Sequence, residues 1–198
     1  KNVCNGRDTS VCFISHQECS DFLDANHRQG YTSAKIRLGL RNKETNELLS
    51  IMTFNNMRKT MGLRNNDNEN TWELSRFCSK LNTNVRGGAS KLLKYFIKTF
   101  NPECIVSFSD IAHTKGNLYR VLGFNLVSIS DPGYVWSSID DKIYHHRVQC
   151  QKHNLKNLLK DNTIDISKST EREIMESHGF VQVYDCGVIR WELKLGEK

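Results

Sequence analysis

Two adjacent glycines, Gly87 and Gly88, stand directly before a long amphipathic segment, and this junction constrains the fold more than any other feature of the chain. Glycines have no Cβ atom, so successive backbone N–H groups can converge on one point, and a helix that begins behind them adds the positive end of its dipole. Apolar residues recur on one face from Leu92 to Phe100, with lysines elsewhere, which predicts a helix that ends before Pro102. The junction therefore predicts an anion-binding loop at the start of a buried helix.

Strands are predicted on both sides of this helix. Residues 104–108 form a short apolar run that is typical of a buried strand, and residues 34–54 have the pattern of an antiparallel hairpin around a polar turn. In residues 72–78 the side chains are expected to alternate between the two faces of a strand, and we predict that this strand precedes the loop. Strict alternation would place two sets on opposite faces of that strand: Trp72, Leu74, Arg76 and Cys78 on one face, and Glu73, Ser75 and Phe77 on the other.

This order of parts carries a family resemblance. A strand, the Arg86-Gly87-x-Ala89 loop, a long helix, a second strand and the segment Asn117 to Phe124 together resemble the acyl-CoA core of the GNAT acyltransferase superfamily, over roughly residues 33 to 130. The resemblance implies an α+β fold with a mixed, mostly antiparallel sheet flanked by helices. It also implies acetyl-CoA or another acyl-CoA as cofactor, for which the expected contacts are Ser75, Phe77, Arg86, Gly87, Gly88, Ala89 and Asn117.

Three residues are candidates for acid–base catalysis. Glu73 on the strand before the loop could take a proton from an attacking amine, or could instead pair with Arg76 or Arg37. The resemblance places Tyr119 where a tyrosine often protonates the leaving thiolate; the alternative is core packing. Asp110 could orient a substrate amine, or could cap the following helix.

A narrower resemblance covers more of the chain. The segments at 22–30, 48–54, 73–82, 87–92 and 184–187 are similar to a domain of phage proteins of the homing endonuclease type, which is also akin to the Mom family of phage DNA modifiers. In those proteins the domain usually follows a nuclease domain, which is not visible in this sequence. The resemblance implies DNA as a partner, and it implies that the chain could be the C-terminal part of a longer protein.

The charge balance agrees with an anionic partner. The chain has 28 Lys and Arg against 22 Asp and Glu, a formal charge of +6 and a pI near 8.9, which favours nucleic acid or nucleotide phosphates. Two polar, basic stretches at 55–70 and 142–160 could bind the phosphate backbone of a nucleic acid, although each could also be a solvated surface. The candidate nucleic-acid-binding residues in them are Arg58, Lys59, Arg64, Tyr144, Arg147 and Lys152.

The expected division is a GNAT-like core at 1–140 and a smaller part at 141–198 packed on it. The smaller part should contain a basic helix, a second helix, and a β-hairpin in which residues 181–184 face residues 188–193. It could extend the sheet, cover the ligand cleft or contact DNA.

No apolar run reaches the ~18 residues of a membrane span, and the first residues do not form a signal peptide, so we expect a cytoplasmic protein. The seven cysteines lack the spacing of a disulfide scaffold and are expected to be reduced. Cys4, Cys12, His16 and Cys19 lack the tight pairs of a structural zinc site, so no metal is predicted. His27 either caps a helix or faces the ligand cleft.

Two hypotheses about function follow. In the first, the chain is an acyl-CoA-dependent transferase, a phage-type protein that modifies a DNA base as the Mom family does. In the second, the same fold has no chemistry and serves as the DNA-binding domain of a phage homing endonuclease. The fold alone cannot choose between them.

Overall fold

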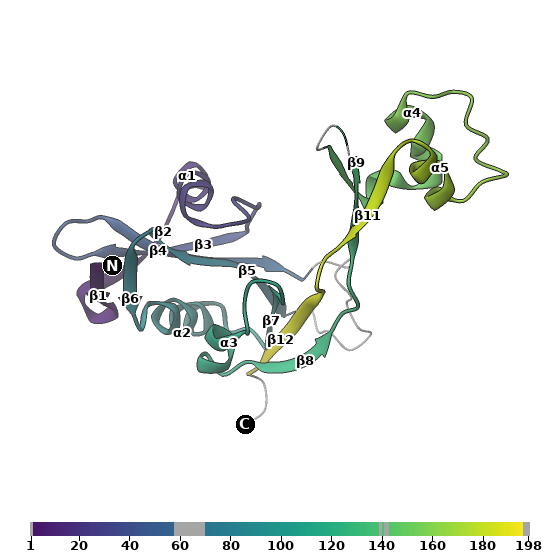
Figure 1. The fold of residues 1–198 in the computed structure, drawn as a ribbon. Coiled ribbons are helices and arrows are strands. Elements are labelled where there is room, and N and C mark those ends of the chain that lie inside the picture. Colours follow the sequence, from purple (N-terminus) through teal and green to yellow (C-terminus); the bar gives the residue numbers. More distant parts are fainter. Residues whose placement is uncertain (1, 58–69, 139, 141–142, 196–198) are drawn as a thin grey trace. The chain divides into compact units, whose positions relative to one another are not determined.

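The computed structural model describes residues 2–57, 70–138, 140 and 143–195 (Figure 1). The chain divides into two compact units. The core unit comprises residues 1–109, 115–128 and 189–198, and the second unit comprises residues 110–114 and 129–188. The sequence-based boundary at residue 140 differs from this division, because the strand at 134–138 belongs to the second unit and the last strand returns to the core sheet.

The core unit is built on a sheet in which the described residues contribute seven strands, in the order β2-β3-β4-β5-β7-β12-β8. Their bounds are β2 Thr9–Phe13, β3 Ile36–Asn42, β4 Leu48–Asn56, β5 Thr71–Ser79, β7 Cys104–Asp110, β8 Asn125–Ile129 and β12 Val188–Lys194. Neighbours from β2 to β5 are antiparallel, while β5 and β7 are parallel. The predicted hairpin at 34–54 is confirmed as β3 and β4.

Helices cover both faces of this sheet, with α1 (His16–Asn26) on one face and α2 (Gly88–Phe100) on the other (Figure 1). On the α2 face, Phe96 stacks on Phe54 at 3.6 Å between ring centroids and meets the edge of Trp72 at 5.3 Å. On the α1 face, the buried cluster contains Ile14, Cys19, Leu23, Leu48 and Ile51. Both helices thus bury an apolar stripe, as the pattern of α2 predicted.

A β-bulge at Ser75 makes the predicted alternation of β5 wrong. The register with β4 pairs Thr53 with Arg76 but Phe54 with Leu74, so Ser75 is an extra residue. Before the bulge, Trp72 faces α2; after it, Cys78 packs against the cluster on the α1 face. Because cross-strand partners share a face, Glu73 and Arg76 both point to the α1 side rather than to opposite sides.

The stretch between β5 and α2 contains a strand that the sequence pattern did not reveal. Residues Thr83–Arg86 form β6, which pairs in parallel with β1 (Asn2–Asn5). A short 3-10 turn, η1 (Gly6–Asp8), leads from β1 into β2. A Cβ at Gly6 would lie only 3.0 Å from the carbonyl oxygen of Arg86, so the N-terminal turn packs directly on the loop before α2.

The short helix α3 (Asn117–Val121) lies against β12. Gly116 precedes it with φ +74°, and a Cβ there would come 2.0 Å from the Trp191 ring. The Trp191 ring also stacks on Tyr119, with centroids 5.3 Å apart and 12° between planes. Its indole N–H donates to Ser109 Oγ at 2.7 Å. This packing fixes α3 to the sheet.

The second unit has its own small sheet and core. In the described residues its strands are ordered β10-β9-β11, with bounds Tyr144–His146, Tyr134–Ser138 and Phe180–Tyr184. The bounds of its helices are η3 Arg147–Cys150, η4 Lys152–Asn154, α4 Leu155–Leu159 and α5 Glu171–Ser177. Its buried cluster consists of Trp136, Cys150, Leu155, Ile164, Ile174 and Met175.

Two predictions about this region are wrong. In the predicted stretch 142–160, the described residues 143–160 form no single basic helix, because a strand, two 3-10 turns and one short α-helix share them. The predicted hairpin does not form either: β11 pairs with β9, and β12 joins the core sheet. Asp185 explains the turn, since its Oδ1 accepts from the backbone N–H groups of Gly133 and Gly187 and so ties the end of β11 to the start of β9.

Within the described residues, every helix is too short or too polar to span a bilayer.

Candidate functional site

The strands β5 and β7 part in the middle of the core sheet. Their ladder pairs Thr71 with Cys104, Trp72 with Ile105 and Glu73 with Val106. Just beyond it, Ser107 Oγ donates to the carbonyl of Leu74 at 2.8 Å. A side chain therefore takes over from the backbone ladder at this point.

The hydroxyl of Tyr119 lies beside β7 at this point. It lies 3.0 Å from Ser107 Oγ, within hydrogen-bond distance, and donates to the carbonyl of Phe108 at 3.3 Å. Burial raises the pKa of Tyr119, although the hydrogen bond with Ser107 and the charge of Arg76 act in the opposite direction. The phenol is therefore protonated at neutral pH, as a general acid must be. Its ring also packs on Trp191 and Phe124. The two roles predicted for Tyr119, core packing and protonation of the leaving thiolate, are therefore compatible.

Glu73 is 6% exposed and lies on the α1 face of the sheet, level with Asn55 of β4 and Val106 of β7. The guanidinium of Arg37, one alternative partner, donates to the carbonyls of Ala34 and Ile14. The bulge places Arg76 on the same face as Glu73. Glu73 is thus a buried carboxylate at the place where the two strands part.

Near the start of α2 lies a cavity of about 640 Å³, here called the basic cavity. Its walls come from β1, η1, the end of β6 and α2, and its lining residues are Asn5, Gly6, Arg7, Arg86, Gly87, Ser90, Lys91 and Lys94. Gly87 has φ +73°, and among the described residues no side chain caps α2 and no acid occupies its first turn. Backbone N–H groups at the helix start are therefore directed at an electropositive space, which suits a phosphate.

The predicted cofactor residues are only partly brought together. Arg86 and Gly87 line the basic cavity, while Gly88 and Ala89 are buried beside it. Gly88 is required for packing, since a Cβ would lie 2.9 Å from Val85 and 3.1 Å from Leu40. Three further predicted contacts, Ser75, Phe77 and Asn117, lie on β5 and α3 and do not line the cavity. Arg7 and Lys94 line it but were missed, because the role of the N-terminal turn depends on its contact with β6.

Asp110 does not cap α3, whose N-cap is Gly116. Its Oδ1 accepts from the backbone N–H of Ala112 at 2.8 Å, and its Oδ2 lies 3.9 Å from His113 Nδ1. The carboxylate therefore holds the turn after β7, and Asp110 belongs to the second unit. Its catalytic role stays a prediction.

The predicted nucleic-acid contacts are scattered. Arg58, Lys59 and Arg64 lie outside the described residues. In the second unit, Tyr144 is 66% exposed, Arg147 lies over the Tyr134 ring at 5.3 Å, and Lys152 donates to the carbonyl of Ile166 at 3.4 Å.

The net charge is unevenly divided between the units. The second unit has 7 Lys and Arg against 10 Asp and Glu, a net charge of −3, which leaves 21 against 12, or +9, for the core unit. The positive charge of the chain therefore belongs to the core unit and not to the region with the aromatic candidates.

His27 follows α1 and accepts from the backbone N–H of Gln29 at 3.1 Å, so it occupies the capping position that was one of its two predicted roles. Burial lowers the pKa of His27 below its ordinary 6.5, and the charge of Arg76 lowers it further. As pH falls, His27 binds a proton in the unfolded chain before it does so in the folded chain. The contribution of neutral His27 to the free energy of unfolding is therefore present above pH 6.5 and is lost below it.

We therefore expect His27→Gln to unfold at a urea midpoint that falls less than that of the wild type between about pH 7.5 and about pH 5.5. The exposed His153→Gln variant is the control for the loss of a histidine elsewhere in the chain. If the urea midpoints of the wild type and His27→Gln depended equally on pH, His27 would bind a proton equally easily in the folded and the unfolded chain.

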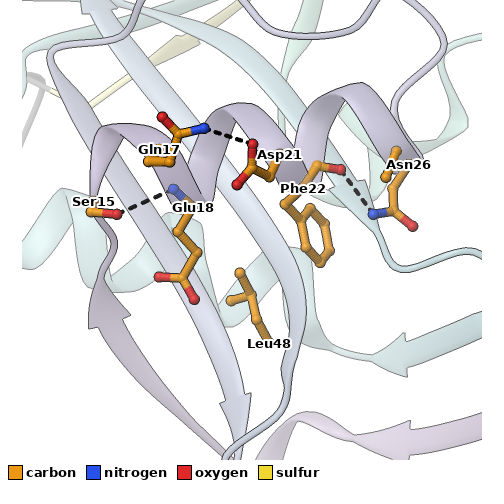
Figure 2. A pocket seen from close by; sticks show the side chains of 8 residues that line it. Ser15, Gln17, Glu18, Asp21, Phe22, Asn26 and Leu48 are labelled. Atoms are coloured by element: carbon orange, nitrogen blue, oxygen red, sulfur yellow. Dashed lines mark hydrogen bonds between the residues drawn. The ribbon is translucent and has the colours of Figure 1, made fainter.

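A second cavity, of about 600 Å³, runs along α1 and is lined by Ser15, Gln17, Glu18, Asp21, Phe22, Ala25, Asn26 and Leu48 (Figure 2). Its polar groups bind one another: Ser15 Oγ accepts from the Glu18 N–H at 3.2 Å, and Gln17 donates to Asp21 at 2.8 Å. Glu18 also accepts from Arg41. None of the predicted site residues lines this cavity, and its groups hold α1 in place.

Comparison with known proteins identifies the fold. No protein-family model and no curated protein sequence matches the chain. The structure is similar to the ribosomal-protein-S18-alanine N-acetyltransferase of Escherichia coli, with a TM-score of 0.54 at 8% identity over 96% of each chain. It is also similar to an acetyltransferase of Bacillus subtilis solved with CoA, with a TM-score of 0.53 at 13% identity over 94% of this chain and 99% of that one.

A third similar structure is that of yncA from Salmonella typhimurium, solved with acetyl-CoA, with a TM-score of 0.52 at 11% identity over 96% of each chain. These likenesses confirm the predicted GNAT-like α+β fold, with its mixed, mostly antiparallel sheet flanked by helices. At such low identities they describe the fold and leave the chemistry to the residues of this chain.

Proposed function

Starting from the GNAT fold of the chain, we propose that the protein is an acyl-CoA-dependent N-acyltransferase that uses acetyl-CoA or another acyl-CoA. The observation that carries the proposal is the position of the Tyr119 hydroxyl, beside Ser107 and the carbonyl of Phe108 where β5 and β7 part. The similar acetyltransferase structures solved with CoA and acetyl-CoA support the choice of cofactor.

The residues of the chain fit such a cofactor. Pyrophosphate needs N–H donors and cations, and the basic cavity offers the uncapped start of α2 together with Arg86. Bound acyl-CoA would supply a thioester as acyl donor. In the proposed reaction, Glu73 would take a proton from the acceptor amine, whose nitrogen would replace the thiol at the acyl carbon. Tyr119 Oη would give its proton to the departing sulfur.

The contribution of Arg86 to cofactor binding is directly testable. Arg86→Ala is expected to weaken acetyl-CoA binding by roughly tenfold, because a charge-assisted hydrogen bond to phosphate is lost. Calorimetric titration of acetyl-CoA into the two proteins measures the change. Arg147→Ala, which removes an exposed arginine from the second unit, is the matched control and should bind like the wild type. Unchanged binding by Arg86→Ala would mean that the cofactor phosphates lie elsewhere.

The acceptor is the finer part of the proposal. The phage-type, Mom-like resemblance suggests the amine of a DNA base, and the net charge of +9 on the core unit supports a polyanionic acceptor. If DNA binds but acetyl-CoA does not, the alternative of a non-catalytic DNA-binding domain of a homing endonuclease would be favoured instead. The nuclease partner domain and the cytoplasmic location stay predictions.

A further inference from the structure

The N-terminal turn is fixed against the loop that begins α2. The β1–β6 ladder places Asn5 opposite Arg86. Lys91 Nζ donates to the carbonyl of Gly6 at 2.8 Å and to that of Thr9, and Thr9 Oγ1 donates to the same Gly6 carbonyl at 2.7 Å. The backbone on both sides of Arg7 is therefore held in place at the basic cavity.

The side chain of Arg7 is available to a ligand. It is 84% exposed, and its Nε lies 3.8 Å from the carboxylate of Asp8, which is 54% exposed, so the ion pair has little strength in water. Lys94, on the second turn of α2, is also exposed and lines the same cavity. Lys91, by contrast, is engaged with the two carbonyls. Arg7 and Lys94 are thus two cations of the cavity with side chains open to solvent.

These two cations exceed what a pyrophosphate needs. The start of α2 and Arg86 already provide donors for one pair of phosphates, whereas CoA carries a third phosphate as a monoester on its ribose. A phosphomonoester carries −1.5 to −2 charges near neutral pH, more than either phosphate of the pyrophosphate bridge, and so it pairs best with two cations.

We propose that Arg7 and Lys94 bind the 3′-phosphate of the CoA ribose, so that the chain distinguishes CoA from 3′-dephospho-CoA. This inference rests on the proposed function and adds a specificity-determining role for the N-terminal turn. Recognition at this site depends on β1 and η1, which lie outside residues 33 to 130, the range of the sequence resemblance.

The test is calorimetric titration of CoA and of 3′-dephospho-CoA into the wild type, Arg7→Ala and Lys94→Ala. The wild type should bind CoA roughly tenfold more tightly than 3′-dephospho-CoA. Either substitution should remove most of that difference by weakening CoA binding, while 3′-dephospho-CoA binding stays unchanged. Lys168→Ala, which removes an exposed cation from the second unit, should retain the wild-type ratio.

The outcomes separate this inference from the proposed function. Equal affinity of the wild type for the two ligands, or a ratio that survives both substitutions, would overturn the assignment of Arg7 and Lys94 while acyl-CoA binding stands. Binding of neither ligand would overturn the proposed function and this inference with it. Because Arg7 and Lys94 are exposed, both variants should fold, which the unchanged affinity for 3′-dephospho-CoA would verify.

Discussion

Replacing Tyr119 with phenylalanine is expected to lower kcat for acyl transfer by a factor of roughly 10² to 10⁴, the range of general acid catalysis. The change removes the proton that the leaving sulfur would take, while the ring keeps its packing on Trp191 and Phe124. The dissociation constant for acetyl-CoA should therefore be nearly unchanged. Initial rates of thiol release, measured with the best acceptor amine of the wild type, test the first statement, and calorimetry tests the second.

The pH dependence of the wild type provides a further readout. Because burial raises the pKa of Tyr119 above its ordinary value of 10, its hydroxyl stays protonated over the neutral range and should cause no loss of rate there.

Tyr144→Phe, which alters an exposed tyrosine of the second unit, is the matched control for Tyr119→Phe. A Tyr119→Phe variant with the wild-type kcat would leave Tyr119 with core packing as its only role.

The second large effect concerns stability. Gly116→Ala is expected to destabilise the folded chain by about 2 to 5 kcal/mol, which sums the cost of a left-handed backbone and that of overpacking. A Cβ at this position would lie 2.0 Å from Trp191, whose buried ring stacks on Tyr119 and donates its N–H to Ser109. Thermal unfolding followed by circular dichroism should show a midpoint lowered by roughly 5 to 15 °C.

Gly123→Ala is the matched control, because Gly123 follows the same helix and also has a positive φ, +88°. A Cβ there would meet Leu193 at an ordinary 3.8 Å, so only the backbone cost of about 1 to 2 kcal/mol applies. If Gly116→Ala proved no less stable than Gly123→Ala, the close packing of Trp191 on Gly116 would be refuted.

Local chemistry explains why much of the core could be predicted from the sequence. The glycines before Leu92, the apolar stripe of α2 and the stop at Pro102 all act within a few residues, so the pattern alone predicts the helix and its positive end. The β3–β4 hairpin is equally local. The order of these parts was sufficient to indicate the GNAT fold.

The features of the fold and the site that could not be predicted depend on contacts between segments far apart in the sequence. The bulge at Ser75 exists because β4 and β5 are out of register by one residue, and it alone brings Glu73 and Arg76 to one face. The pairing of β6 with β1 is likewise invisible in a polar stretch, and so Arg7 was missed. At the C-terminal end, the pattern of two short strands favoured a hairpin, but Asp185 directs β11 to β9 instead.

The most direct test of the account is a crystal structure of the chain with CoA bound. The measurement is the distance from the CoA sulfur to the Tyr119 hydroxyl oxygen. We predict a sulfur between β5 and β7 within hydrogen-bond reach of Tyr119, roughly 3 to 4 Å, with a phosphate at the start of α2. A CoA molecule bound elsewhere, or one whose sulfur lies beyond the reach of Tyr119, would contradict the proposed chemistry.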